Sequence, residues 1–297
     1  MTLPSNTHAD VLVQINDNIR LLASLLALTD HPQQAQQRKP HGTHAHARAC
    51  QKQLAPYAAH EAAMQLQRLL DQGVPLEAIF TRALSSPVET DPAPEWLPPR
   101  WDEHLMQFER DAALAAWWRA EVGAWEQSRE QIARVFDGLV LKPFFKPFFG
   151  DVRQRLIVMP NIAYPTNTTL ALRGGTDLVC VIPPRVAWGD NPPWPFDEDP
   201  AHVYGAAVNA FARLLMLDCP LANDDRLHTR AQLVTAGLVA LFLEDQLSGS
   251  EAKAYALMQR KVNGIDVQPA VDGLRAFRAE VERGQAATLL DFLPARI

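Results

Sequence analysis

Residues 199–217, with the sequence DPAHVYGAAVNAFARLLML, indicate one of the main helices of the fold. Asp199 can accept a hydrogen bond from a free amide at the start of a helix. Pro200 fits the first helical turn, because the N–H that proline lacks would have no partner there. The sequence therefore predicts a helix from Pro200 to about Leu217.

Three short segments upstream of this helix predict β-strands. They span residues 155–159, 168–172 and 177–182, and each is rich in β-branched residues and bounded by Pro, Asn or a Gly-Gly pair. The Gly174-Gly175 pair precedes a strand, whereas a phosphate-binding loop precedes a helix. We therefore expect a hairpin turn at this pair.

Helical patterns continue downstream of Leu217. A second helix is predicted over about 230–247, and the pattern Ser248-x-x-Glu251 opens a third, which ends at Gly264. A last helix is predicted over about 269–283. The small sheet is thus followed by a helical C-terminal part.

The first half of the sequence also predicts helices. One helix starts at Thr7 and extends to Leu26, and others span about 58–70 and 75–83. Residues 31–48 are rich in Gln, His and Pro and predict an exposed excursion. A long helix is predicted over about 105–136, and Trp118 and Trp125 should lie two turns apart on one side of it.

Prolines mark one boundary in the chain. Five of them lie between Ser85 and Arg100, where they forbid a helix interior. We expect a helical region over 1–84, a Pro-rich linker over 85–103, and a second part over 104–297 that forms one compact unit with the first. The fold class that these patterns predict is α+β, mainly helical.

The composition limits the classes of function. Hydrophobic residues make up 47% of the chain, and the formal net charge is −6. This balance argues against nucleic acid as a partner, because a phosphate-binding surface is rich in Lys and Arg. The apolar stretch 19–28 is too short to span a bilayer, and residues 1–10 show no secretory pattern. We expect a cytoplasmic protein with no membrane partner.

The stretch His202-Val203-Tyr204-Gly205-Ala206 stands where a zincin carries its HExxH motif, in the first helix after the small sheet. In that motif two histidines at i and i+4 reach one zinc ion from one face of a helix. The sequence resembles an uncharacterised bacterial family of gluzincin-like domains with an HEFGH-type motif. The local residues that agree with it are His202, Tyr204, Gly205, Val208 and Asn209.

Two upstream segments are similar to the same family, namely residues 56–60 (PYAAH) and the helical opening at 16–28. The resemblance covers most of the chain. It implies a zincin-like core of a small β-sheet and two main helices, with further N- and C-terminal helices.

The residues that zinc chemistry needs are replaced. Val203 stands where the family has its general base glutamate, and Ala206 stands where it has its second histidine. No carboxylate lies at 230–232, where the third ligand is expected, and we interpret Glu244 and Asp245 as a solvated cap region. One histidine cannot hold a catalytic zinc ion. We therefore predict no metal ligands, no cofactor and no zincin-type catalytic residues.

Polar residues on the 200–217 helix are the best candidates for a binding site. His202, Asn209 and Arg213 are spaced to lie on about the same face of the helix. Together with Tyr204 and Arg230 they are the candidate cleft or binding residues. A purely structural role for His202 is the alternative interpretation.

Two hypotheses of function follow. The first is a catalytically inactive metallopeptidase homologue that serves as a scaffold for a peptide or protein, bound along the sheet edge. The second is an enzyme of different chemistry that uses the polar residues of the former zincin cleft. An enzyme would gather these side chains in one deep pocket, whereas a scaffold would disperse them. A structural interaction module with an exposed apolar patch is a third alternative.

Other features have simpler explanations. The histidines at positions 41, 44 and 46 match no zinc motif, so adventitious metal binding or none is expected. Residues 144–149 (FFKPFF) predict a buried connector, because Pro143 and Pro147 impose an extended path and four phenylalanines fit a core. No GxSxG pattern occurs, and the three cysteines, at positions 50, 180 and 219, are expected to be free thiols and not nucleophiles.

Overall fold

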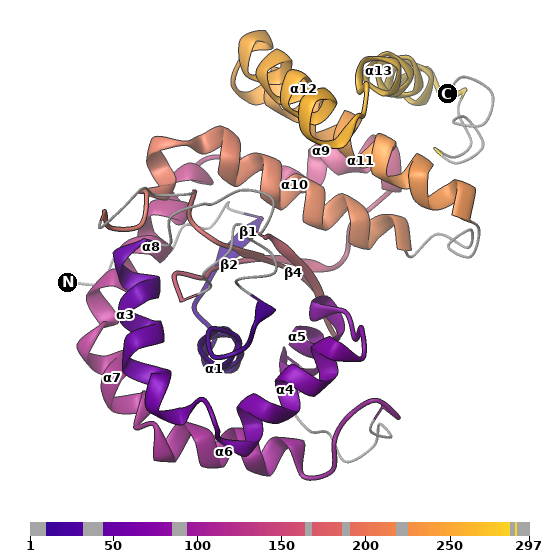
Figure 1. Ribbon diagram of the computed structural model, residues 1–297. Helices are drawn as coiled ribbons and strands as arrows, with labels where there is room; N and C mark the ends of the chain where they lie inside the picture. Colours follow the sequence, from indigo (N-terminus) through magenta and orange to yellow (C-terminus); the bar gives the residue numbers. More distant parts are fainter. Residues whose placement is uncertain are drawn as a thin grey trace.

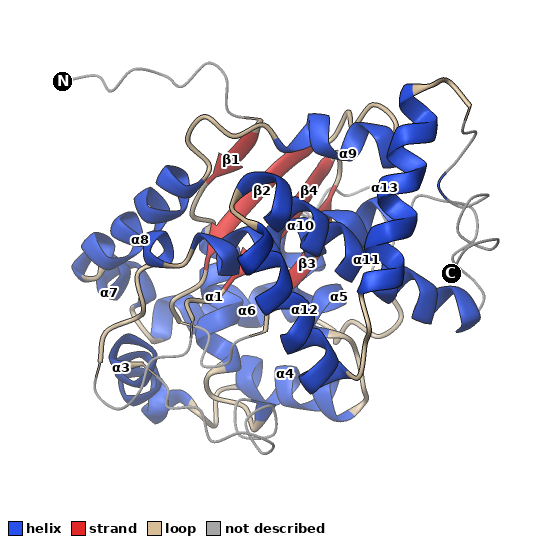
Figure 2. Ribbon diagram, turned by 90° about the horizontal axis from the view of Figure 1, so that it is seen from above, coloured by secondary structure: helices blue, strands red, loops and turns tan. Residues whose placement is uncertain are grey.

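A computed structural model describes residues 10–31, 44–84, 94–163, 168–185, 191–217 and 225–285 and residue 289, apart from the side chains of residues 225–229. Helices surround a small sheet on both sides (Figures 1 and 2). The predicted α+β class with a mainly helical content is confirmed. One large hydrophobic core includes residues from Val11 to Leu289, so the two halves of the chain are built around a shared interior.

The sheet has four strands in the order β1-β2-β4-β3. The strands β1 (Val11–Val13), β2 (Arg155–Pro160) and β4 (Asp177–Ile182) are parallel, and β3 (Leu170–Gly174) pairs antiparallel with β4. The three strands predicted from the sequence are confirmed. Gly175 has a left-handed φ of 59° between β3 and β4, which confirms the expected turn.

The strand β1 replaces the first part of the helix that was predicted from Thr7. Its register pairs Val13 with Val158 of β2, and the Gln14 N–H donates to the Val158 carbonyl oxygen over 3.1 Å. The helix α1 (Asp17–Leu26) begins only after Asn16, whose side chain accepts a hydrogen bond from the Ile19 N–H. The prediction failed because strand pairing with a distant segment leaves no mark in the local spacing of apolar residues.

The helix α1 lies at the centre of the N-terminal part and is buried on all sides from Ile19 onward. Figure 1 shows it end-on, with other helices arranged around it as a ring. A helix that is enclosed in this way is mostly apolar around its circumference, and in α1 the buried exceptions are Arg20 and Ser24. The surrounding elements are α3 (Ala45–Leu54), η1 (Ala55–Tyr57), α4 (Glu61–Asp71), α5 (Leu76–Leu84), α6 (Trp101–Asp111), α7 (Leu114–Ala120) and α8 (Val122–Val135).

Two predictions for this ring were wrong. The long helix over 105–136 is divided into α6, α7 and α8, with Ala113 in the left-handed conformation at φ 48°. Short segments can follow the circumference of α1, whereas one straight helix could not. Residues 44–48 are also not part of an exposed excursion, because α3 begins at Ala45 and both His44 and His46 are buried; residues 32–43 lie outside the described part.

The predicted linker 85–103 is only partly described. Residues 85–93 lie outside the described part, and α6 already begins at Trp101.

The phenylalanine-rich segment forms a helix, α9 (Leu141–Phe149), and not an extended connector. Pro143 is compatible with a helix because it lies in the first turn, where an N–H needs no partner. The Asp10 carboxylate caps this helix by accepting hydrogen bonds from the N–H groups of Leu141 and Lys142. The expectation of burial is confirmed, since Phe145 and Phe148 lie in the core.

The C-terminal part consists of α10 (Pro200–Leu217), α11 (Asp225–Gln246), α12 (Gly249–Asn263) and α13 (Gln268–Glu282), preceded by the short η2 (Phe196–Glu198). The bounds of α10 are those predicted, and α11 begins earlier than expected. The predicted ends of α12 are confirmed: the Ser248 side chain accepts from the Glu251 N–H, and Gly264 ends the helix with φ 68°. Helix α10 packs on β3 and β4 and also contacts α11.

Helices α11 and α13 approach each other closely at Gly237. A Cβ atom at this position would lie 2.8 Å from the Ala270 Cβ and 2.9 Å from the Leu274 Cδ1. We expect Gly237→Ala to lower the free energy of unfolding by about 1–3 kcal/mol, because the added methyl group overpacks this contact. Urea unfolding measures the change.

The matched control for this prediction is Gly123→Ala in α8, where an added Cβ meets no atom within 4 Å. Alanine is the better helix former, so this control should be neutral or slightly more stable than the natural chain. Equal stability of the two variants would show that α11 and α13 do not pack as closely as described.

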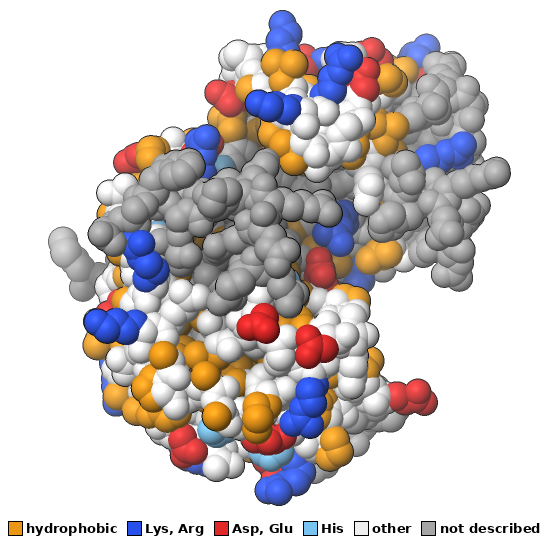
Figure 3. Space-filling view, viewed as in Figure 1, with side chains coloured by type: hydrophobic (Ala, Val, Ile, Leu, Met, Phe, Trp, Pro, Cys, Tyr) orange, Lys and Arg blue, Asp and Glu red, His pale blue; other side chains and the backbone are white. Residues whose placement is uncertain are grey.

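Two properties bear on the surroundings of the protein: the charge of its surface and the length of its apolar helices. On the face shown in Figure 3, side chains of both charges are scattered over the described residues, among hydrophobic and uncharged ones. Within the described ranges, no helix is long and apolar enough to cross a membrane.

Candidate functional site

The start of α10 is fixed by Asp199, as its position in the sequence predicted. Its Oδ1 atom accepts a hydrogen bond from the His202 N–H over 3.1 Å, and its Oδ2 atom accepts one from Arg185 over 2.7 Å. An acidic side chain at this place also interacts favourably with the positive end of the helix dipole. The first turn of α10, with His202 in it, is therefore held in a defined position.

His202 is half-buried and connects α10 to the end of β4. Its Nε2 atom lies 3.1 Å from the Pro183 carbonyl oxygen, to which it must donate because a carbonyl only accepts. This contact fixes the tautomer with the proton on Nε2. The imidazole therefore has a structural partner at the nitrogen that is farther from the backbone.

Tyr204 lies on another side of α10, in the core. Its hydroxyl donates to the Val135 carbonyl oxygen of α8 over 2.7 Å. Its ring makes edge contacts with Phe136 and Phe242, at centroid distances of 5.6 and 5.4 Å. Burial raises the pKa of the Tyr204 phenol, so it stays protonated and holds α10 to α8.

The other candidate residues lie towards the far end of α10 and on α11. Asn209 is half-buried, whereas Arg213 and Arg230 are exposed. The Arg213 Nη2 atom lies 3.7 Å from the Glu77 Oε1 atom of α5. The contacts of His202, Tyr204 and Arg213 thus lead to three separate elements, the end of β4, α8 and α5, and they define no common centre.

Arg173 is a polar residue of this region that the sequence analysis did not single out. It lies in β3, and its Nη2 atom donates to the Leu214 carbonyl oxygen near the end of α10 over 2.8 Å. A cation suits this position because the C-terminal end of a helix carries a partial negative charge. No sequence motif marks such a contact between a strand and a helix.

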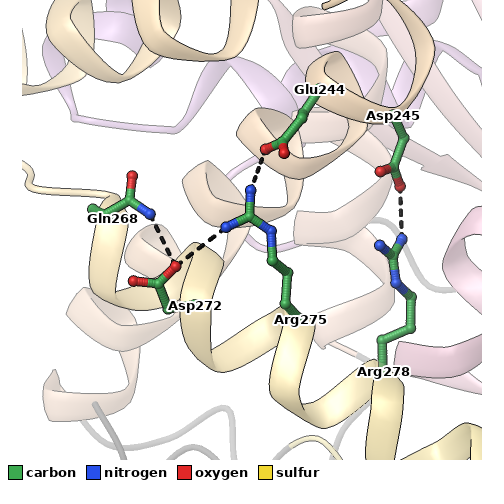
Figure 4. Close-up of polar contacts among 6 residues, drawn as sticks. All are labelled: Glu244, Asp245, Gln268, Asp272, Arg275 and Arg278. Carbon is green, nitrogen blue, oxygen red and sulfur yellow. Dashed lines mark hydrogen bonds and ion pairs between the residues drawn. The ribbon is translucent and has the colours of Figure 1, made fainter. Parts of the chain in front are cut away.

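Glu244 and Asp245 are exposed near the end of α11, as predicted, and they also form ion pairs with α13. Figure 4 shows Glu244 pointing to Arg275 and Asp245 pointing to Arg278, and the Asp245–Arg278 distance is 2.6 Å. The Asp272 carboxylate completes the group by accepting from Arg275 and from Gln268. All these side chains are partly exposed, so each pair contributes little to stability on its own.

His44 and His46 are buried at the start of α3, where the His46 ring lies near Trp117 of α7 and Trp125 of α8. The His44 Nδ1 atom accepts from the Ala47 N–H over 3.1 Å and caps α3, and the His46 Nδ1 atom lies 3.1 Å from the Glu121 Oε2 atom. Burial lowers the pKa of both imidazoles, that of His44 to about 3. His41 lies outside the described part.

No metal centre is formed by the described residues. Within these ranges, no group of three or more His, Cys, Asp or Glu side chains is placed to hold a metal ion.

Cys50 and Cys180 are free thiols, as expected, and both are buried. Burial raises the pKa of the Cys50 thiol to about 12 and also raises the pKa of Cys180. A thiol that stays protonated is a poor nucleophile. Cys219 lies outside the described part.

Comparisons with protein-family models, with curated proteins and with solved structures find no match. The assignment of a function therefore rests on the residues of the chain itself. In chemical terms, the polar residues of α10 hold helices and strands together, and their described partners are a backbone carbonyl or a surface carboxylate.

Proposed function

We propose that the chain is a catalytically inactive homologue of a zinc metallopeptidase that serves as a binding scaffold for a peptide or protein. In this proposal the sheet together with α10 and α11 is a zincin-like core. The main observation behind this proposal is the burial of Val203. This residue stands at the position of the general base glutamate and is 0% exposed.

The surroundings of Val203 support the loss of catalysis. A general base must reach a water molecule in an open cleft. Val203 instead belongs to the main hydrophobic core, and Ala206 carries only a methyl group where a second histidine would bind zinc. A charged side chain at position 203 would have no water around it.

Helix α11, where the third zinc ligand is expected, also supports the loss of catalysis. Arg230, in the region where a third ligand is expected, is a cation and cannot bind zinc. The nearest acidic residues further along α11 are Glu244 and Asp245, which are paired with the arginines of α13.

The sheet edge at β1 supports the binding of an extended peptide. Gln14 directs its N–H to β2, so Val13 directs its own N–H and carbonyl groups away from β2. Leu12 on this strand is 46% exposed. The opposite edge strand, β3, packs against α5, and Leu84 lies 3.5 Å from the place of a Cβ on Gly174. Free backbone groups at an edge can pair with an added strand.

The alternative function, an enzyme of different chemistry that uses the polar residues of α10, is less well supported. It requires His202, Tyr204 and Arg213 to act on one substrate, whereas their contacts lead to different elements and Tyr204 is buried in the core. A substrate cleft would instead gather such groups around one point.

Two experiments test the proposal. The first measures the zinc content of the purified full chain together with its hydrolysis of unstructured peptides. We expect no stoichiometric zinc and no hydrolysis, and tightly bound zinc with hydrolysis would overturn the proposal.

The second experiment measures the binding of short peptides in an array to the natural chain and to two variants. Val13→Pro removes an outward N–H, whereas Leu12→Thr changes a side chain of the same strand and keeps the backbone. We expect binding that Val13→Pro abolishes and Leu12→Thr retains. Binding that is equal in both variants, or its absence for every peptide, argues against the β1 edge.

A further inference from the structure

The outward face of α12 carries apolar side chains that are exposed. Eleven large hydrophobic side chains are exposed over the described residues, and three of them, Leu257, Met258 and Val262, lie on this one helix. Leu257 is the most exposed of the eleven, at 68%. Single exposed apolar side chains are common on protein surfaces, whereas a group of them on one face can mark a site of interaction.

The opposite face of α12 packs on α11. Ala252 is buried on this side, and Tyr255, Ala256 and Gln259 are half-buried. Burial raises the pKa of the Tyr255 phenol, which agrees with its enclosed position. Helix α12 therefore has apolar residues on two faces, one packed on α11 and the other exposed at the outside of the molecule (Figure 1).

The exposed residues form two adjacent rows along the helix, because side chains four positions apart are neighbours on a helix surface. In one row, Leu257 lies between Lys253 and Lys261. Arg260, three positions after Leu257, is a further neighbour on the surface of the helix. Three basic side chains thus surround Leu257. The row beside it is apolar and consists of Ala254, Met258 and Val262, all of them exposed.

The charge of α12 is opposite to that of the whole protein. The helix contains three basic residues and one acidic residue, Glu251, so its net charge is +2, whereas that of the chain is −6. Lys253, Arg260 and Lys261 form no ion pair with any residue that the structure describes. Positive charge beside an apolar surface is complementary to a partner that has acidic groups beside apolar ones.

Two other occupants match this face less well. A second copy of α12 would bring the basic residues of both copies together, and like charges repel. A membrane surface suits a helix whose apolar face is free of charge. In α12, Lys261 lies within the exposed apolar face, next to Val262 and one turn after Leu257.

We propose that the outer face of α12 binds an acidic amphipathic helix of another protein. The apolar side chains of the partner cover Met258 and Val262 and pack around Leu257, and its carboxylates pair with the three basic residues of α12. The small side chain of Ala254 lets the second helix approach closely. This interaction is separate from the function proposed above, which depends on the β1 edge.

Fluorescence anisotropy with labelled peptides and the full chain tests the proposal. One peptide is an amphipathic helix with Leu and Ala on one face and Glu on the other, and its twin carries Lys in place of every Glu. Since a single helix face makes a small interface, we expect a Kd of about 10–100 µM for the acidic peptide and at least about tenfold weaker binding of its twin. Added salt should weaken the acidic complex, because it screens exposed charges.

Two variants locate the binding surface. Leu257→Ser and Lys261→Glu should each weaken the binding of the acidic peptide about fivefold or more, because each removes a central contact. The matched controls, Leu217→Ser in α10 and Lys52→Glu in α3, make the same changes at other exposed positions and should leave binding unchanged. All four positions are exposed, so the variants should fold, which near-ultraviolet circular dichroism checks.

Three kinds of result would overturn the proposal. The first is the absence of binding of the acidic peptide, and the second is equal binding by the natural chain and both variants of α12. The third is a different occupant of the face. Sedimentation would reveal a dimer that Leu257→Ser dissociates, and flotation would reveal binding to phosphatidylserine vesicles that Lys261→Glu abolishes.

Discussion

Val203→Glu is expected to lower the free energy of unfolding by about 3–5 kcal/mol at pH 8, because it places an unpaired negative charge in the core. Val203 is 0% exposed, and α10 packs at this point on the sheet and on α11. A carboxylate there loses its hydration and gains no partner. Urea unfolding followed by circular dichroism measures the difference from the natural chain.

The pH dependence of this variant gives a second result. Burial raises the pKa of a carboxyl group above its ordinary value of about 4.3, so the folded state of the variant binds a proton more readily than the unfolded state. The loss of stability should therefore shrink as the pH falls from 8 to 5. An unchanged loss over this range would show that the glutamate is solvated.

The control is Ala206→Glu, which adds the same side chain to the same helix at a half-buried position. We expect a much smaller loss, because a long side chain at the rim can reach water. Equal stability of Val203→Glu and Ala206→Glu would contradict the core position of Val203. It would also remove the main support for the inactive homologue, because position 203 would then face an open cleft.

The elements that the sequence predicted well are those with local end signals. Helix α10 starts at the Asp199-Pro200 pair, and α12 runs from the Ser248 cap to Gly264, as expected. Caps depend on residues that are three or four positions apart, so they can be recognised in a single sequence. The strands β2, β3 and β4 were recognised for a similar reason, since turn residues bound each short apolar run.

The elements that were missed depend on distant partners. The strand β1 exists because Val13 pairs with Val158, and α9 begins where Asp10 caps it from the other end of the chain. Their local patterns favoured a helix and an extended connector, respectively. Tertiary contacts outweigh such preferences, because propensity amounts to less than about 1 kcal/mol per residue.

The candidate site was predictable in part. Position in the sequence placed His202, Asn209 and Arg213 on one helix, but it could not show that His202 binds the Pro183 carbonyl or that Arg213 faces Glu77. The same limit applies to the tryptophans. Trp118 and Trp125 were expected on one side of one helix, whereas they lie on two helices and share Arg20 as a contact.

Acidification is expected to destabilise the fold through His44, by about 3 kcal/mol between pH 7 and pH 4. Burial, which is the largest cause, and the nearby His46 and Arg48 together lower the pKa of this imidazole to about 3. Each unit of difference from the unfolded value of about 6.5 corresponds to about 1.4 kcal/mol.

The sign of this effect follows from the lowered pKa. The unfolded chain binds the proton first, so the stability that neutral His44 contributes is complete above about pH 6.5 and is lost as the pH falls towards 3. Protonation also removes the acceptor that caps α3 at the Ala47 N–H. The charged groups that face this pair of histidines are Arg20 and Glu121, which act on His46 in opposite directions, and Arg48, which acts on His44.

The matched variant is His44→Ser, because serine caps a helix as well and does not titrate in this range. Its stability at pH 7 should be lower, since the change leaves space in the core, but its stability should fall less steeply with acid. Urea unfolding at several pH values between 7 and 4 gives the free energy of unfolding as a function of pH for each protein. Because all other titrating groups are common to both, the difference between the two curves reports on His44. Curves that run parallel over this range would mean that His44 is accessible to protons in the folded state and does not hold α3 in its neutral form.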